Sequence, residues 1–195
     1  MASIPAWNAF GVLPPAQGGS LSTAGRSPYE VALTDVMLHY GTSPERCAIL
    51  DGFLRYRAAL HGAGLIAGFQ WLNGSFVENV EDLEGRPPND LDAVTFYHLP
   101  VGTTQAALAA AHRDVFIFDL ATKQRLKTNY RVDAFMESLG RAPEKLVERS
   151  WYWYSMWAHR RNDQWKGYLQ VPLDPGQDQD AMDILNAVRA KAPQP

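Results

Sequence analysis

Apolar residues recur at helical spacing in several stretches of the chain, and these stretches predict helices. Residues 42–45, Thr-Ser-Pro-Glu, have the spacing of a capping box with a proline at an early helical position. We expect a helix of about 18 residues to begin there and to end before Gly62, with its apolar residues on one face. Alanine-rich or amphipathic composition predicts three further helices, at residues 103–112, 143–159 and 178–191.

Short runs rich in β-branched or aromatic residues lie near glycines and prolines, and each run predicts a strand. They cover residues 69–72, 90–96, 130–136 and 166–171. Residues 115–118 predict a short strand or a buried turn that ends at Asp119. Together these elements predict an α/β or α+β fold, in which helices pack behind a mixed β-sheet.

The two ends of the chain differ from its centre. Residues 1–28 contain four prolines, four glycines and a single charged residue, Arg26, so we expect an extended arm without a regular core element. Residues 29–173 are expected to form the main domain, and residues 174–195 a C-terminal helix and tail.

Composition and charge limit the class of protein. A chain of 195 residues that is 46% hydrophobic can bury one core of its own. The formal charge of −3 argues against a general nucleic-acid coat protein, although a local basic site is still allowed. The only cysteine, Cys47, excludes an internal disulfide and is expected to pack as a small apolar residue. Without an apolar stretch of membrane-spanning length, we expect a soluble, cytoplasmic protein that contacts no membrane.

Two aspartates at the start of one predicted strand indicate a metal site. Asp90 and Asp92 are two residues apart, so their side chains point to the same face of the strand. Neighbouring carboxylates repel each other unless a cation or a proton lies between them, and hard oxygen ligands suit Mg²⁺ or Mn²⁺. Asp133, at the centre of another predicted strand, would complete a cluster for two metal ions if the two strands are adjacent.

Gly74-Ser75 follows the strand predicted at residues 69–72. Glycine lets a backbone approach a phosphate closely, and the serine hydroxyl can donate a hydrogen bond to phosphate oxygens. A Gly-Ser pair or an isolated Asp-x-Asp is common in proteins, so the prediction depends on their order and strand context together. Asp119 is the alternative third acid, but it precedes an expected loop at Thr122-Lys123, and we therefore favour Asp133.

Three stretches carry a resemblance to a known superfamily. Residues 71–76 (Trp-Leu-Asn-Gly-Ser-Phe), 88–94 and 130–134 resemble the motifs of the polymerase-beta-type nucleotidyltransferase superfamily, in particular an uncharacterised bacterial branch of it. Further similar blocks, which extend the resemblance over most of residues 4–173, lie at residues 4–5, 11–15, 151–154, 159–161 and 165–167. One departure is the separation of Ser75 from Asp90 by fourteen residues, which could form a lid, an acceptor-binding flap or a mobile insertion without a role.

The resemblance implies a metal-dependent reaction in which an acceptor hydroxyl attacks the α-phosphate of a nucleoside triphosphate such as ATP and releases pyrophosphate. Asp90 and Asp92 would hold Mg²⁺, and Asp133 would bind a second ion and help to deprotonate the acceptor. Gly74-Ser75 would position the β- and γ-phosphates. The acceptor could be a protein, an RNA or a small molecule, and family analogy suggests a toxin–antitoxin or defence context.

The predicted helix at residues 143–159 is followed by basic residues. Arg160, Arg161 and Lys166 could meet the triphosphate, because guanidinium and ammonium groups pair with phosphate. Trp153 and Trp157 are four residues apart on one helical face and are expected to form an aromatic core stripe, although one ring could instead stack on a nucleobase. Two other functions remain open: a glycosyltransferase that uses Asp-x-Asp, and a non-catalytic nucleotide-binding or scaffold protein.

Overall fold

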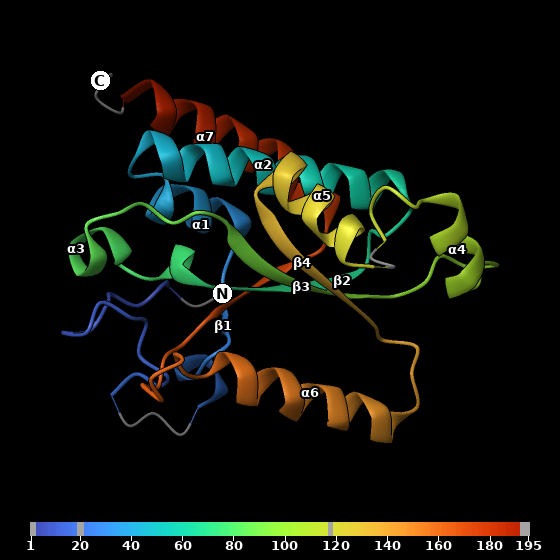
Figure 1. The fold of residues 1–195 in the computed structure, drawn as a ribbon, viewed down its shortest axis with the longest axis horizontal. Coiled ribbons are helices and arrows are strands. Elements are labelled where there is room, and N and C mark those ends of the chain that lie inside the picture. Colours follow the sequence, from blue (N-terminus) through green and yellow to red (C-terminus); the bar gives the residue numbers. More distant parts are fainter. Residues whose placement is uncertain (1–2, 19–21, 117–118, 192–195) are drawn as a thin grey trace.

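The computed structural model describes residues 3–18, 22–116 and 119–191, and these residues form a mixed sheet covered by helices on both faces (Figure 1). The strands, in chain order, are β1 (Tyr29–Glu30), β2 (Gly68–Asn73), β3 (Leu91–Tyr97), β4 (Val132–Ser138) and β5 (Leu169–Pro172). Their spatial order is β1-β5-β2-β3-β4. Strand β2 is antiparallel to both of its neighbours, whereas β1 pairs with β5 and β3 with β4 in parallel. The predicted mixed α/β fold is confirmed.

Helices α1, α2, α5 and α7 lie on one side of the sheet and α6 lies on the other (Figure 1). The helices are α1 (Leu33–Tyr40), α2 (Pro44–Gly62), α3 (Val80–Glu84), α4 (Gln105–Ala111), α5 (Leu120–Tyr130), α6 (Pro143–Trp157) and α7 (Asp178–Lys191). Short 3-10 helices are η1 (Thr23–Gly25), η2 (Ser75–Val77) and η3 (Pro175–Gln177). Within the described ranges, none of these helices is long and apolar enough to cross a membrane.

The helix predicted from residue 42 onwards is α2, and its start follows the capping signal. Ser43 is the N-cap, its hydroxyl accepts a hydrogen bond from the Arg46 backbone N–H at 3.2 Å, and Pro44 is the first helical residue. Cys47 is buried in this helix, as expected. The other three predicted helices are also present, as α4, α6 and α7.

Helix α5 replaces the loop that was expected at Thr122-Lys123. Its N-cap is Asp119, whose carboxylate accepts hydrogen bonds from the Thr122 backbone N–H at 2.7 Å and from the Thr122 hydroxyl at 2.8 Å. Few apolar residues mark the buried side of this helix, so periodicity did not reveal it. The helix continues to Tyr130, and Arg131 then takes a left-handed conformation with φ 54°, so β4 begins two residues later than predicted.

Residues 115–118 were predicted to form either a short strand or a buried turn, and Val115 and Phe116 form a buried turn and bend. Residues 117–118 of the same prediction lie outside the described residues. Strand β5 begins at Leu169 rather than at Lys166.

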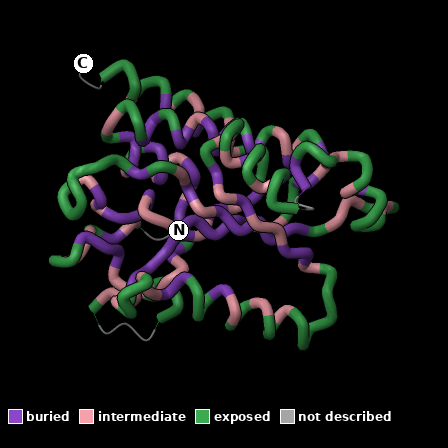
Figure 2. The backbone as a smooth tube through the Cα atoms, viewed as in Figure 1, coloured by how far each residue is buried: buried purple, intermediate pink, exposed green. Residues whose placement is uncertain are grey.

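Two hydrophobic cores lie on the two faces of the sheet, which is the most continuously buried part of the chain (Figure 2). The larger core joins the sheet to α1, α2 and α7. The smaller one is aromatic, and in it Trp153 and Trp157 of α6 pack against Phe135, which confirms the predicted core stripe. The N-terminal segment also reaches the interior, because Val12 and Leu13 are fully buried.

Candidate functional site

The three predicted acids lie on one face at one end of β3 and β4. The parallel register of these strands places Asp92 opposite Asp133, and Asp90 directly precedes β3, two residues before Asp92. Val94 and Phe135 follow two residues after the paired acids and pack in the aromatic core beneath α6. Because side chains alternate along a strand, the acids face the same side of the sheet as α6, beyond the edge of that core.

Gly74 lies directly against this acid cluster. It follows β2, whose last residue, Asn73, is the register partner of Asp92. Its backbone has φ 83° and ψ −170°, a region that is accessible almost only to glycine. A Cβ atom at Gly74 would lie 2.8 Å from Asp92 Oδ2. The turn into Ser75 and η2 therefore depends on glycine both for its conformation and for its close approach to the carboxylate.

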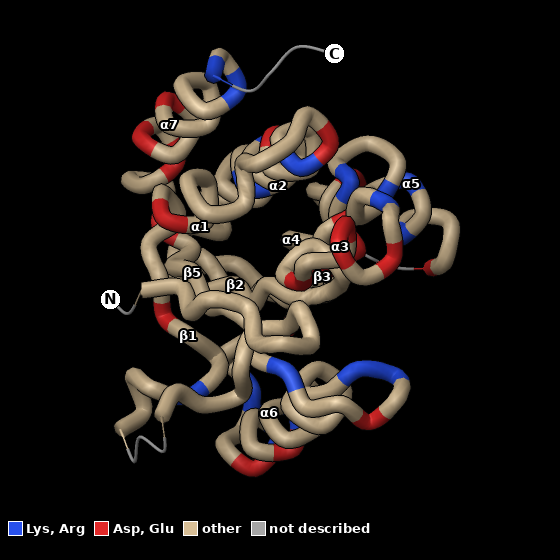
Figure 3. Tube along the Cα trace, turned by 90° about the vertical axis from the view of Figure 1, so that its left-hand side faces the viewer, with Lys and Arg blue, Asp and Glu red and all other residues tan. Residues whose placement is uncertain are grey.

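A polar cleft of about 580 Å³ opens at this end of the sheet. It is lined by every residue that sequence reasoning had assigned to the site: Gly74, Ser75, Asp90, Asp92, Asp133, Arg160, Arg161 and Lys166. Six further residues, which had not been assigned to it, also line the cleft: Glu78, Glu84, Arg86, Lys127, His159 and Asn162. Basic residues of α5 lie on one side of β3 and those of the segment after α6 on the other (Figure 3).

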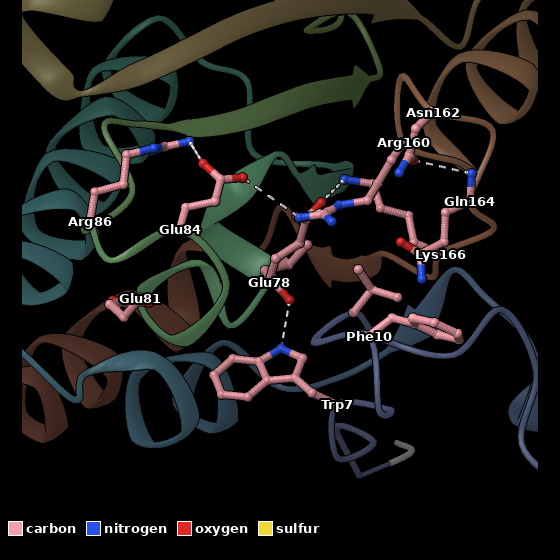
Figure 4. A network of polar contacts seen from close by, with 12 residues as sticks. Trp7, Phe10, Glu78, Glu81, Glu84, Arg86, Arg160, Asn162, Gln164 and Lys166 are labelled. Carbon is pink, nitrogen blue, oxygen red and sulfur yellow. Dashed lines mark hydrogen bonds and ion pairs between the residues drawn. The ribbon is translucent and has the colours of Figure 1, made fainter.

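Glu78 holds two of the three basic residues that were assigned to the triphosphate. Arg160 Nε donates to Glu78 Oε2 at 2.9 Å, and Lys166 Nζ donates to Glu78 Oε1 at 2.6 Å (Figure 4). Glu78 is 4% exposed and Lys166 is 6% exposed, so the paired charges are buried together. Arg161, in contrast, is exposed and has no ion-pair partner among the described residues. Of these three cations, it is the one that can meet a ligand without first losing a protein partner.

The segment between Ser75 and Asp90 includes Glu78, and buried contacts hold the backbone before and at this residue. Phe76 and Val77 are buried, and Arg46 Nη1 and Nη2 donate to the backbone oxygens of Phe76 and Glu78 at 2.6 and 2.7 Å. Arg46 is itself 1% exposed and makes a two-point ion pair with Glu81. The first part of this segment therefore packs into the protein and contributes the buried Glu78 to the cleft.

Two lysines of α5 neutralise the acids on the other side of the cleft. Lys127 Nζ contacts Asp90 Oδ2 and lies 3.9 Å from Asp133 Oδ2, while Lys123 Nζ lies 2.9 Å from Asp133 Oδ1. Sequence reasoning missed both lysines because it assigned this stretch to a loop. The signal that could have found them is their spacing of four residues, which in a helix places both ammonium groups on one side.

Asp92 is the acid of the cluster whose charge is least compensated. Burial raises its pKa to about 6, and the neighbouring carboxylates of Asp133 and Asp90 add to the effect. The pKa of Lys127 is also raised, first by its hydrogen bond to Asp90. The positive charges of Lys166 and Lys127 lower the pKa of Asp92, but they offset the effect of burial and of the neighbouring carboxylates only in part.

The carboxylates of Asp90, Asp92 and Asp133 are the type of ligand that suits a hard divalent cation, but their oxygens do not converge on one point. Within the described ranges, no three Asp, Glu, His or Cys side chains are placed to hold a metal ion. In this arrangement Asp133 pairs with Lys123 and Asp90 with Lys127. Carboxylate oxygens are the ligands that Mg²⁺ or Mn²⁺ prefers, and the three acids lie on one face of the sheet. Asp119, the alternative third acid, caps α5 and does not line the cleft.

A family model described as a family of unknown function, DUF6932, matches residues 5–172. The chain belongs to this family. No curated protein and no solved structure matches the chain. The region shared with the DUF6932 family contains the whole cleft, from Gly74 to Lys166, together with Lys123 and Lys127 of α5.

Gly74 provides a test of the cleft in this DUF6932 member. Replacing Gly74 with alanine is expected to lower the free energy of unfolding by about 1–3 kcal/mol, because the backbone region is unfavourable for alanine and the new methyl group meets Asp92. Urea denaturation measures this loss. Gly102 is the matched control, since it has φ 80° but an added methyl group there would have nothing within 4 Å. Equal losses in the two variants would show that contact with Asp92 contributes nothing.

Proposed function

We propose that this protein is a Mg²⁺-dependent nucleotidyltransferase, which moves a nucleoside monophosphate from a nucleoside triphosphate to an acceptor hydroxyl. The observation that carries the proposal is the register of β2, β3 and β4. It aligns Asn73, Asp92 and Asp133 across three adjacent strands and leaves Gly74 against the central carboxylate. A glycine turn of the kind that lets a backbone approach a phosphate thereby lies beside carboxylates of the kind that bind Mg²⁺, which supports the proposal.

The reaction forms a bond between the acceptor oxygen and the α-phosphorus and breaks the bond between that phosphorus and the bridging oxygen, so that pyrophosphate leaves. Asp90 and Asp92 would hold Mg²⁺ or Mn²⁺, with Asp133 as the third ligand and the group that accepts the acceptor's proton. A bound divalent ion supplies charge stabilisation for the transferred phosphoryl group. Gly74 and Ser75 would orient the β- and γ-phosphates from the end of β2.

The remainder of the cleft is suited to a charged ligand. Its volume of about 580 Å³ lies within the range of small-molecule sites in proteins. Arg161 is available to pair with a phosphate, whereas Arg160 and Lys166 are held by Glu78 and shape the wall of the cleft. The acceptor is a protein, an RNA or a small molecule, and a toxin–antitoxin or defence role belongs to the proposal by analogy alone.

A thermal-shift titration with each nucleoside triphosphate, with and without Mg²⁺, tests the proposal. We expect a metal-dependent stabilisation of about 2.7 kcal/mol at a ligand concentration one hundred times the Kd. The stabilisation should disappear in the Asp90→Asn/Asp92→Asn double variant. If no nucleotide shifts the wild-type melting temperature, the proposed function fails, and a scaffold role becomes the favoured function.

Analysis of the product separates the two transferase functions. Release of pyrophosphate on incubation with a nucleoside triphosphate and an extract of acceptors supports nucleotidyl transfer. Release of a nucleoside diphosphate from a sugar nucleotide would instead identify an Asp-x-Asp glycosyltransferase.

A further inference from the structure

Helix α5 brings two ammonium groups to the edge of the acid cluster, and they differ in how firmly they are held. Lys123 has two partners: Asp133, at 2.9 Å from its Nζ, and the ring of Phe135, whose centroid lies 4.1 Å from the same atom. Lys123 does not line the cleft. It is a fixed countercharge for Asp133, and the aromatic ring holds its position by a cation–π interaction.

Lys127 is less constrained and lies in the cleft itself. Its side chain is 40% exposed, and its ammonium group has only Asp90 and Asp133 as ion-pair partners among the described residues. A lysine side chain is flexible and carries a compact charge, so it can change partners without a change in the backbone. The last turn of α5 therefore presents a movable cation to the acid cluster.

A divalent cation and the ammonium group of Lys127 compete for the same carboxylate. Asp90 cannot keep its contact with Lys127 and also direct both oxygens toward a metal ion shared with Asp92. Once the metal ion is bound, its positive charge also repels the lysine. The next anions available to Lys127 within the cleft are the phosphates of a bound nucleotide, to which an ammonium group donates strong hydrogen bonds.

We propose that Lys127 is a positioning residue. Its ammonium group pairs with Asp90 while no metal ion is bound, and it moves to a phosphate of the nucleotide when the metal ion and the nucleotide bind. This inference rests on the function proposed above. Lys127 remains protonated throughout, and no covalent bond to it forms or breaks. Arg160 and Lys166 cannot take this part, because both are paired with Glu78, which is 4% exposed.

Replacing Lys127 with methionine should have opposite effects on two ligands. Calorimetric titration with Mn²⁺ alone should show affinity higher by about three- to tenfold, because the competing ammonium group is gone. Titration with inorganic tripolyphosphate in saturating Mn²⁺ should show affinity lower by about tenfold, because a phosphate partner is lost. Tripolyphosphate is used because it carries the phosphates of every nucleoside triphosphate without requiring a particular base.

The matched control is Lys145→Met, which removes a lysine that pairs with Glu148 at 2.6 Å on the exposed side of α6. It should change neither affinity. Lys127→Arg retains the positive charge and should keep the wild-type Mn²⁺ affinity. If the methionine variant fails to fold, Lys127→Gln also removes the charge and is titrated in its place, with the same two opposite changes expected. A merely structural lysine would lower both affinities together on replacement, or change neither.

Three results would contradict the inference. If Lys127→Met leaves both affinities unchanged, or lowers both, while the wild type binds Mn²⁺, Lys127 has no positioning role and the proposed function stands. If wild type and Lys127→Met both fail to bind Mn²⁺, the proposed function fails, and the inference with it. Loss of Mn²⁺ binding in Asp92→Asn separates these cases, because it establishes that the wild-type signal comes from the acid cluster.

Discussion

Replacement of Asp92 by asparagine is expected to lower turnover by at least about a thousandfold, which corresponds to about 4 kcal/mol of lost transition-state stabilisation. Under the proposed function, asparagine has nearly the same shape as aspartate but supplies no negative charge to a bound metal ion. The chain should remain folded, because Asp92 has no hydrogen-bond or ion-pair partner among the described side chains. Pyrophosphate release and far-ultraviolet circular dichroism measure the two parts of this expectation.

The same variant should become more stable than the wild type in metal-free buffer at neutral and alkaline pH. The folded-state pKa of Asp92 is raised to about 6 from its ordinary value of 3.8, so the folded protein binds its proton more tightly than the unfolded chain does. Stability is therefore lost as the pH rises from about 4 to about 6 and remains lower above that window. At pH 8 the gain in Asp92→Asn should be on the order of 1–3 kcal/mol, and it should vanish below about pH 4.

Asp133 provides the control of opposite sign. Its carboxylate pairs with Lys123 at 2.9 Å, so Asp133→Asn leaves an ammonium group without its partner and should reduce stability at pH 8. A loss of stability at pH 8 in Asp92→Asn as well would contradict the assignment, since Asp92 would then be a structural acid.

The second large effect is expected at Glu78. Replacing it with glutamine should lower the free energy of unfolding by about 3 kcal/mol. The reason is that the buried ammonium group of Lys166 and the guanidinium group of Arg160 both lose the carboxylate with which they pair. For a chain of this length, the melting temperature should fall by roughly 6–12 °C. Thermal unfolding followed by circular dichroism measures the change.

Glu84 is the matched control for Glu78, because it lines the same cleft but its side chain is 44% exposed. It pairs with Arg86 at 2.6 Å and lies 3.9 Å from Arg160. Exposed ion pairs contribute little, so Glu84→Gln should change stability by less than about 0.5 kcal/mol. Similar losses in the two variants would mean that burial of the Glu78 pair has no special energetic role.

Local signals in the sequence were sufficient for most of the secondary structure near the site. Ser43 and Pro44 marked the start of α2, and the apolar run between Gly68 and Gly74 marked β2. The two-residue spacing of Asp90 and Asp92 determined that their side chains share a face, since alternation is a property of any strand. Helix α5 was missed because its start depends on the capping side chain of Asp119 rather than on a visible apolar stripe.

The sequence by itself therefore marked Gly74, Ser75 and the three aspartates as candidates for one site, and it determined that Asp90 and Asp92 share one face of their strand. Only the tertiary structure decided what those charges are paired with. The register of β3 and β4 set Asp92 beside Asp133, the packing of α5 brought Lys127 to Asp90, and burial of Glu78 tied up Lys166. These partners lie far apart along the chain, up to 88 residues in the case of Glu78 and Lys166. Ion pairing depends on distance in space and on local burial, and a local pattern of residues encodes neither.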